Sequence, residues 1–144
     1  MTVKAILSRK GNDVITIEST VTLSAAVNIL AERRIGALVV VASADKQVAG
    51  ILSERDIVRA LAQRGPGALQ EAVGQVMTRR VVTCTESDTV AALMERMTQG
   101  KFRHLPVVER GKLVGLVSIG DVVKHRLGEM EHESNALREY ILTA

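Results

Sequence analysis

An internal repeat restricts the fold of this chain more than any other feature of its sequence. The segment from Val14 to Val41 aligns without a gap with the segment from Val81 to Val108. After a turn that is two residues longer in the first copy, GILSERDIV (residues 50–58) aligns with GLVSIGDVV (residues 115–123). Because the agreement continues on both sides of this length difference, we interpret the chain as two copies of one structural unit.

Each copy predicts the same order of elements: a short strand, a helix, two strands joined by a tight turn, and a second helix. Apolar residues spaced i, i+4, i+7 predict the first helix and place one of its faces in a core. These residues are Leu23, Val27 and Leu30 in the first copy and Val90, Met94 and Met97 in the second. The central strands are continuous apolar runs, which are typical of strands buried on both faces. They span residues 37–41 and 48–52 in the first copy, and 105–108 and 113–117 in the second. We expect the short strands at 15–17 and 82–84, and second helices that begin near Glu54 and Ile119.

The two copies together predict an α/β fold built from tandem βαββα units. Neither copy, of about 55 residues, would bury enough apolar surface to be stable alone, so we expect the two to pack as a pseudo-twofold pair. We place the first repeat at residues 1–66 and the second at 67–128, because RGPG at 64–67 favours a loop between them. The stretches 3–7 and 72–77 precede the repeats and are interpreted as short helices or linkers that pack onto the sheets.

Residues 129–144 form the third predicted segment, a helical tail. Leu137, Tyr140 and Ile141 have helical spacing, which indicates a helix with one apolar face. Such a face is expected to be covered, either by the rest of its own chain or by another chain. The sequence leaves both possibilities open.

The composition excludes several classes of protein. Of the 144 residues, 47% are hydrophobic and 24% are charged, a balance typical of a folded chain rather than a disordered one. No apolar run approaches the roughly 20 residues of a membrane helix, and the first residues lack the apolar core of a signal peptide. We therefore expect a cytoplasmic protein that does not contact membranes. With no Trp, one Phe and one Tyr, stacking on nucleic-acid bases is nearly excluded. The net charge of +3 permits an anionic partner but is weak evidence for nucleic acid.

Few residues could support catalysis or bind a metal ion. The single cysteine, Cys84, excludes an internal disulfide. On a buried strand it is expected to be an inert apolar side chain rather than a thiol switch. His104, His125 and His132 do not have metal-ligand spacing with a carboxylate. No phosphate-binding loop, nucleophile motif or paired acid and base is recognisable. We therefore expect no enzymatic activity, no metal site and no catalytic cofactor.

A Ser-x-x-Asp motif at the junction of a strand and a helix is the sharpest local signal, and each copy contains one. It comprises Ser53 and Asp56 in the first copy and Ser118 and Asp121 in the second. One interpretation is structural: the serine caps the helix and the aspartate completes a capping box. The other is functional, because the free amides and positive dipole end of a helix start attract phosphate, and a carboxylate there can accept both hydroxyls of a ribose. The motif alone does not separate these interpretations.

The doubled motif gives the chain a resemblance to a known family. GILSERDIV and GLVSIGDVV, which close the two copies, and RHLPVV at residues 103–108 resemble a pair of cystathionine β-synthase (CBS) domains over roughly residues 1–128. The resemblance implies a Bateman module, a disc-like pseudo-twofold pair of CBS domains that commonly forms homodimers. It also implies adenine-containing ligands, such as AMP, ADP, ATP or NAD(H), with S-adenosylmethionine in some members.

The resemblance further implies which residues would hold a nucleotide. Asp56 and Asp121 would each bind a ribose, with Ser53 and Ser118 beside them. The nucleotide at Asp56 would point its phosphates across the pseudo-twofold axis. The phosphate ligands implied there are Arg103, His104 and Arg55. The remaining candidates lie on strands: Thr16, Ile17, Thr83 and Cys84 near the adenine, together with Ala37 and Pro106.

The two copies differ at the positions that are implied to bind phosphate. Gly36 and Ala37 align with Arg103 and His104, and the arginine that precedes Asp56 has a glycine as its counterpart. These positions therefore contribute fewer positive charges to the site beside Asp121 than to the site beside Asp56. We predict two unequal sites, of which the Asp56 site prefers ligands with more phosphate charge.

We expect a stand-alone, non-catalytic sensor of adenine nucleotides that forms a homodimer and acts in signal transduction on a separate, unidentified effector protein. The alternative is a dimerisation or interaction scaffold, whose basic surface or C-terminal helix contacts nucleic acid or a partner protein. Residues 32–34 and 79–80 contain the basic clusters available for such a contact. We expect these clusters to be solvated surface and nucleic acid not to be a partner.

Overall fold

The computed structural model describes residues 1–42 and 47–143 and, apart from the first strand of the second copy, confirms the predicted order of elements. The first copy forms β1 (Thr16–Glu18), α2 (Leu23–Arg33), β2 (Ala37–Ala42), β3 (Gln47–Ser53) and α3 (Glu54–Arg64). The second copy forms α5 (Val90–Gly100), β4 (His104–Glu109), β5 (Lys112–Ser118) and α6 (Ile119–Thr143). The connecting segments form α1 (Val3–Lys10), η2 (Pro66–Gln70) and α4 (Val73–Val76). The predicted α/β fold is therefore confirmed.

The strands repeat the same geometry in both copies. β2 pairs antiparallel with β3 so that Ala37 lies opposite Ser53, and β4 pairs antiparallel with β5 so that His104 lies opposite Ser118. Each hairpin has an irregularity at the same place, after Val40 in the first copy and after the equivalent valine in the second. The turn predicted between β2 and β3 lies largely outside the described residues, at positions 43–46.

The first strand of the second copy differs from the prediction. In the first copy β1 pairs in parallel with β2 over three residues, from Thr16 to Glu18. In the second copy the same pairing is reduced to one bridge between Cys84 and Val107. Val82 is 44% exposed, so only the cysteine end of this segment enters the core and a longer strand would bury nothing further. The strand predicted at 82–84 is therefore a single point of contact.

The two apolar cores exchange their connecting segments. The core of the first repeat contains Val73 from α4, whereas the core of the second repeat contains Val3 and Leu7 from α1. Equivalent backbone hydrogen bonds hold the two segments. The amide of Val73 donates to the carbonyl oxygen of Val21 at 2.8 Å, and the amide of Val3 donates to the backbone carbonyl oxygen of Asp88 at 2.9 Å. Both stretches thus pack onto the sheets as predicted, and both cores cross the predicted division at residue 66.

Two glycines of the repeated motif permit this packing. A Cβ atom on Gly50 would lie 2.6 Å from the sulfur of Met77 and 2.8 Å from the carbonyl oxygen of Thr78. A Cβ atom on Gly115 would lie 2.8 Å from the side chain of Leu7. The connecting segments lie directly over the two glycines, and a larger residue at either position would push them away.

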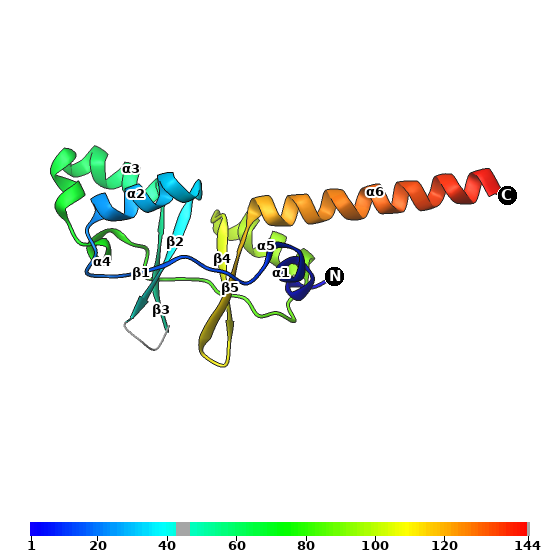
Figure 1. Ribbon diagram of the computed structural model, residues 1–144, viewed down its shortest axis with the longest axis horizontal. Helices are drawn as coiled ribbons and strands as arrows, with labels where there is room; N and C mark the ends of the chain where they lie inside the picture. Colours follow the sequence, from blue (N-terminus) through cyan, green and yellow to red (C-terminus); the bar gives the residue numbers. More distant parts are fainter. Residues whose placement is uncertain (43–46, 144) are drawn as a thin grey trace.

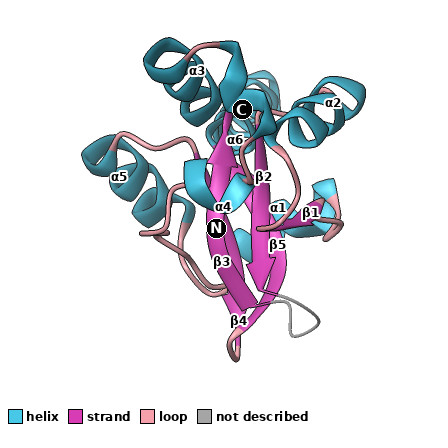
Figure 2. Cartoon of the chain, turned by 90° about the vertical axis from the view of Figure 1, so that its left-hand side faces the viewer, coloured by secondary structure: helices cyan, strands magenta, loops and turns pink. Residues whose placement is uncertain are grey.

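The two halves lie side by side, and α6 extends away from them (Figure 1). β3 and β5 contact each other between the halves. In Figure 2, α2 and α3 lie at one end of the strands, whereas the turn between β4 and β5 lies at the other. The tail predicted at 129–144 is not a separate helix in the described residues, because α6 runs without a break from Ile119 to Thr143. One glycine inside a helix costs only about 1 kcal/mol, which explains why Gly128 does not end it. No helix among the described residues is long and apolar enough to cross a lipid bilayer.

Candidate functional site

The first Ser-x-x-Asp motif forms a complete cap at the start of α3. The hydroxyl oxygen of Ser53 accepts the amide of Asp56 at 3.3 Å, and the Asp56 carboxylate accepts the amide and the hydroxyl of Ser53 at 3.0 and 3.1 Å. The other carboxylate oxygen accepts the hydroxyl of Thr78 at 3.1 Å. This confirms the structural interpretation of the motif in the first copy. It does not exclude the functional one, because the carboxylate remains only partly buried.

The second motif forms the same cap and carries an additional cation. The Asp121 carboxylate accepts the amide of Ser118 at 2.9 Å, and the Ser118 hydroxyl accepts the amide of Asp121 at 3.1 Å. The amine of Lys10 donates to Asp121 at 2.6 Å and to the carbonyl oxygen of Leu116 at 2.7 Å. Burial alone would raise the pKa of Asp121, but the bonds from Lys10 and Ser118 outweigh it and hold this pKa below its usual value. The carboxylate is therefore an anion that already has a partner.

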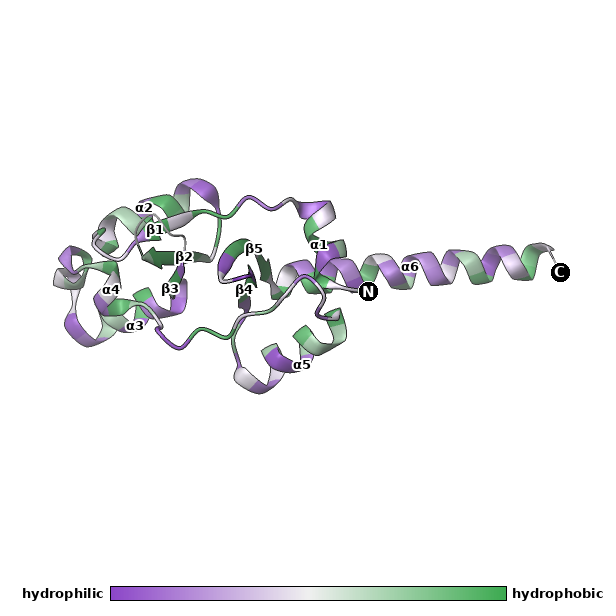
Figure 3. Ribbon diagram, turned by 90° about the horizontal axis from the view of Figure 1, so that it is seen from below, coloured by the Kyte–Doolittle hydropathy of each residue, from purple (hydrophilic) through white to green (hydrophobic). Residues whose placement is uncertain are grey.

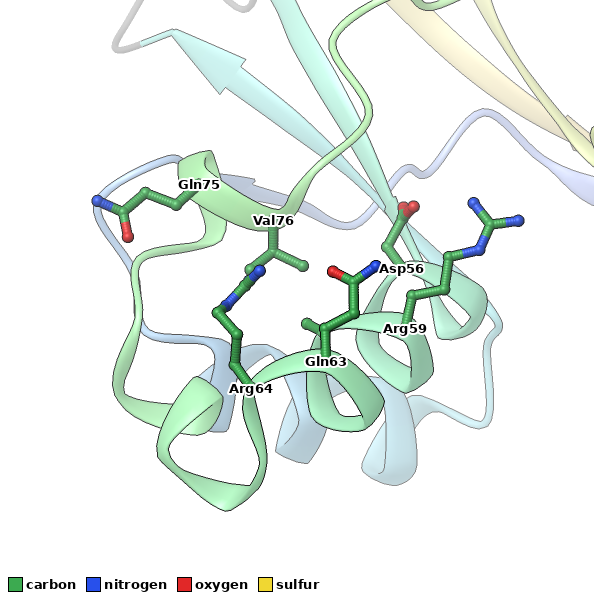
Figure 4. A pocket seen from close by; sticks show the side chains of 7 residues that line it. Asp56, Arg59, Gln63, Arg64, Gln75 and Val76 are labelled. Atoms are coloured by element: carbon green, nitrogen blue, oxygen red, sulfur yellow. The ribbon is translucent and has the colours of Figure 1, made fainter.

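A pocket of about 260 Å³ opens beside the first motif, between α3 and α4. We call it the first pocket; it is lined by Asp56, Arg59, Ala60, Gln63, Arg64, Gln75 and Val76. Figure 4 shows Val76 facing the side chains of α3, with the Asp56 carboxylate at one end of the opening. Arg64 is bound to Glu71 at 2.7 Å, so Arg59 is the lining cation without an ion pair among the described residues.

A second pocket, of about 100 Å³, occupies the equivalent place in the second repeat. It is lined by Ile6, Arg9, Lys10, Asp121, Lys124 and His125. Asp121 and Lys124 occupy the positions that Asp56 and Arg59 have in the first pocket, and His125 replaces Ala60. The two pockets are therefore related by the repeat, but the second is smaller and more cationic.

His125 fills part of the second pocket. It is 4% exposed, and its Nε2 lies 3.1 Å from a carboxylate oxygen of Glu129, four residues later on the same helix. The expectation that no histidine has helical spacing with a carboxylate is therefore wrong for His125. Its Nδ1 has no hydrogen-bond partner within the described part of the chain. Since a buried polar atom without a partner is costly, a water molecule or a polar ligand in the second pocket would stabilise this ring.

The helix α1 contributes two cations that the alignment of the repeats does not reveal. Arg9 and Lys10 line the second pocket, although more than a hundred residues separate them from Asp121. The prediction that this site has fewer positive charges was based only on positions that align between the two repeats. Nothing in the sequence indicates which of the two cores α1 joins, and the structure is needed to place these side chains.

His104 lies where the two repeats meet. Its ring carbon Cε1 is 3.7 Å from the place that a Cβ on Gly36 would take, beside Glu54 at the start of α3. Burial lowers the pKa of His104, and the positive charge of Lys10 lowers it further, whereas Asp121 and Glu54 raise it. The backbone carbonyl of Arg103 accepts the amide of Ile119, the first residue of α6. The pair Arg103–His104 thus lies between the starts of α3 and α6.

The remaining candidate residues are divided between core and surface. Ile17, Cys84, Ala37 and Pro106 are buried. The exposed candidates are Thr16, Thr83, Arg55 and Arg103. None of these eight lines either pocket, so their contact with a nucleotide stays a prediction.

Cys84 has the properties of an apolar core residue. Burial raises the pKa of its thiol to about 12, with a further contribution from the negative charge of Asp88. The thiol therefore stays protonated at neutral pH, where a thiol switch would need the thiolate. In the part of the chain that the structure describes, no three His, Cys, Asp or Glu side chains gather closely enough to hold a metal ion.

The comparisons with known proteins agree with the repeat and with the fold. The family model described as "CBS domain" matches the chain twice, at residues 3–63 and 73–128. The mitochondrial CBS domain-containing protein CBSX3 of Arabidopsis thaliana is 37% identical over 119 residues, which cover 81% of this chain and 58% of that protein. The chain therefore spans little more than half the length of this relative.

Solved structures of CBS-domain proteins have the same fold as this chain. The CBS-domain protein ATU1752 from Agrobacterium tumefaciens is 49% identical, with a TM-score of 0.84 and coverage of 87% of this chain and 92% of that one. The CBS domain protein PAE2072 from Pyrobaculum aerophilum, solved in complex with AMP, is 30% identical, with a TM-score of 0.75 and coverage of 84% and 89%.

Proposed function

The chain belongs to the CBS domain family, and from this membership we propose that it is a non-catalytic sensor of adenine nucleotides. Its two ligand sites lie beside Asp56, the first site, and beside Asp121, the second site. Nucleotide occupancy of these sites regulates a separate effector protein. The related protein from Pyrobaculum aerophilum, solved with AMP, supports the ligand class.

The observation that carries the proposal is the pair of equivalent pockets beside the two capping carboxylates. Each pocket combines an aspartate at a helix start with at least one cationic side chain, Arg59 in the first and Lys124 in the second. A carboxylate accepts ribose hydroxyls, and a cation near a helix start attracts phosphate. A nucleotide presents both groups to the protein, whereas a nucleoside or inorganic phosphate presents only one.

The two sites differ in what a ligand must displace. At the first site the Asp56 carboxylate is bound only by neutral donors. At the second site a ribose must share the Asp121 carboxylate with the Lys10 amine, which donates a hydrogen bond to it at 2.6 Å. We therefore infer that the first site binds a ribose without breaking an ion pair, whereas the second site releases a cation toward the phosphate.

This difference provides a way for occupancy to change the protein. Lys10 is the last residue of α1, and other residues of α1 are part of the second core. A ribose on Asp121 would weaken the hold of Lys10 on the start of α6, so α1 and α6 would shift relative to each other. The ligand can move this equilibrium only by its difference in affinity for the two arrangements.

Calorimetric titration of the full chain with AMP, ATP, NADH and S-adenosylmethionine tests the proposal. We expect at least one of these ligands to bind at two sites of unequal affinity. Asp56→Ala should abolish one site and Asp121→Ala the other. If no ligand binds, and the two substitutions change only the thermal stability, the motifs are caps and the proposal is wrong.

A second candidate function, an interaction scaffold, is favoured by the exposed apolar residues of α6. A scaffold would bind its partner with the same affinity in the presence and absence of adenylates. If that partner were nucleic acid, binding would fall steeply with salt concentration. Fluorescence anisotropy with labelled DNA and RNA at two salt concentrations separates the two functions.

A further inference from the structure

The outer part of α6 lacks any covering within the described chain. Every residue from 130 to 143 is exposed, and this part of the helix extends away from both repeats (Figures 1 and 3). Isolated helices shorter than about 12–15 residues are marginal in water, and most helices gain their stability from packing of an apolar face. Leu137 and Ile141 are 60% and 64% exposed, so here such a face exists without a partner.

Five exposed apolar residues of α6 follow a heptad pattern, whereas the exposed Tyr140 and Leu142 lie outside it. The spacing within this pattern alternates between four and three residues, as at the a and d positions of a coiled coil. The positions in order are Val123, Leu127, Met130, Ser134, Leu137 and Ile141. All five apolar members of this series are exposed, so the stripe begins near the body of the protein and continues along the free part of the helix. Ser134 is the one polar member, at an a position.

We propose that the α6 helices of two copies of this chain form a parallel, in-register, two-stranded coiled coil along this stripe. The charges that flank the stripe select this arrangement. In a parallel coil each g residue faces the e residue five positions later on the other helix. Arg126 then faces Glu131 of the second copy, and Glu133 faces Arg138 of the second copy. Both pairs have opposite charge, and the twofold axis produces each pair twice.

An antiparallel arrangement fits the charges less well. The alignment that packs Leu127 against Leu137 would bring Glu131 against Glu131 and Glu133 against Glu133. Like charges at such positions repel. Moving the helices by one heptad would pair Glu131 with Arg138, but Leu127 would then have no described residue opposite it. Moving them by one heptad in the other direction would place Ile141 opposite residue 116, which lies outside α6. Of these alignments, the parallel one keeps Leu127, Leu137 and Ile141 in the seam and gives both glutamates an oppositely charged partner.

Disulfide scanning of the full chain tests the coil directly. Facing core positions of a coil lie within the Cα separation of about 4.4–6.8 Å that a disulfide allows. Native Cys84 is buried with a raised thiol pKa, so it should not react. Under mild oxidation Ser134→Cys should form a disulfide-linked dimer, whereas His132→Cys, on the outer f position, is the matched control and should form none. Ser134→Cys mixed with Leu137→Cys should give disulfides only between identical variants.

A charge exchange tests the orientation without new cysteines. Glu133 and Arg138 are five positions apart, too far along one helix to contact each other. In a parallel coil, Glu133→Arg should weaken dimerisation roughly tenfold or more, because two attractive pairs become repulsive. Adding Arg138→Glu should restore the affinity of the wild type. Sedimentation equilibrium of the full chain measures both effects and does not require a nucleotide.

Several outcomes would overturn the proposal. These are a monomeric wild type at all concentrations, equal disulfide yields at positions 132 and 134, or no rescue by the second charge exchange. Disulfides that form mainly between the 134 and 137 variants would show the antiparallel pair that is shifted by one heptad. A monomer that sediments with vesicles of phosphatidylcholine and phosphatidylglycerol would assign the stripe to a lipid surface instead.

Discussion

Replacing Asp56 by asparagine separates a ligand-binding carboxylate from a helix cap. A carboxylate has about four acceptor positions, and three of them are already used, by the Ser53 amide, the Ser53 hydroxyl and the Thr78 hydroxyl. A ribose that binds through both hydroxyls would take the free position and displace one neutral donor. Asparagine keeps one acceptor oxygen, so the cap can persist while the anionic acceptor for the ribose is lost.

The expected effect on binding is larger than the effect on stability. A hydrogen bond to a charged group contributes about 1.5–3 kcal/mol, and a neutral one about 1 kcal/mol. Losing the charge on two bonds should therefore weaken binding at the first site by about 2 kcal/mol, roughly 30-fold. The lost charge at the helix start costs about 0.3–1 kcal/mol of stability, which lowers the melting temperature by at most roughly 2–4 °C. Isothermal titration with AMP and differential scanning fluorimetry measure the two quantities.

Asp88 provides a matched control outside both pockets. Its carboxylate accepts the amide of Thr85, three residues earlier, at 2.8 Å, just as Asp56 accepts the amide of Ser53. This hydrogen bond is the main reason that the pKa of Asp88 lies below its usual value, and Arg96 lowers it further. Asp88→Asn should lower the stability by a similar amount and leave AMP binding unchanged. Equal losses of AMP affinity in both variants, or none in Asp56→Asn, would show that the Asp56 carboxylate does not bind the ribose.

Three further substitutions test other parts of the structure. In thermal unfolding, Gly50→Ala should destabilise the fold by about 1–3 kcal/mol, because the added Cβ would lie 2.8 Å from the backbone carbonyl oxygen of Thr78. The control Gly67→Ala should be neutral in the same assay, since no atom lies within 4 Å of its added Cβ. Lys10→Met should cost about 1 kcal/mol at pH 7 after allowance for solvent screening. The folded-state pKa of Asp121 is lowered, so the loss of stability in Lys10→Met should be full above about pH 4 and should shrink as the pH falls through that pKa. Urea unfolding at pH 7 and pH 3 measures this loss. An equal loss at both pH values would contradict the ion pair. Arg103→Ala should weaken AMP binding at the first site more than at the second, and equal weakening in a calorimetric titration would remove the predicted asymmetry.

The repeated elements could be predicted from the sequence because local patterns determine them. The apolar runs at β2 and β4 are buried strands, and the helices α3 and α6 begin at the predicted residues, Glu54 and Ile119. The capping geometry of the motif serines could be predicted for the same reason, since it depends on residues three positions apart. The strands and helices inside each repeat can therefore be predicted from short stretches of sequence.

The contacts between distant segments could not be predicted. Lys10 reaches Asp121 only because α1 packs on the second core rather than on the first. Both cores are aliphatic, so the apolar face of α1 matches either one and the sequence does not distinguish them. The exchange of Ala60 for His125 was visible in the repeat, but its placement in a pocket depends on the same packing of α1.

Native mass spectrometry of the full chain counts the adenylates that each chain binds, and it therefore measures whether the two repeats create two adenylate sites. The wild type should retain up to two adenylate masses per chain in the presence of AMP, ATP, NADH or S-adenosylmethionine. Asp56→Asn and Asp121→Asn should each retain at most one, and the double variant should retain none. A wild-type chain that binds none of these ligands, or a double variant that still binds two, would contradict the presence of two sites beside these aspartates.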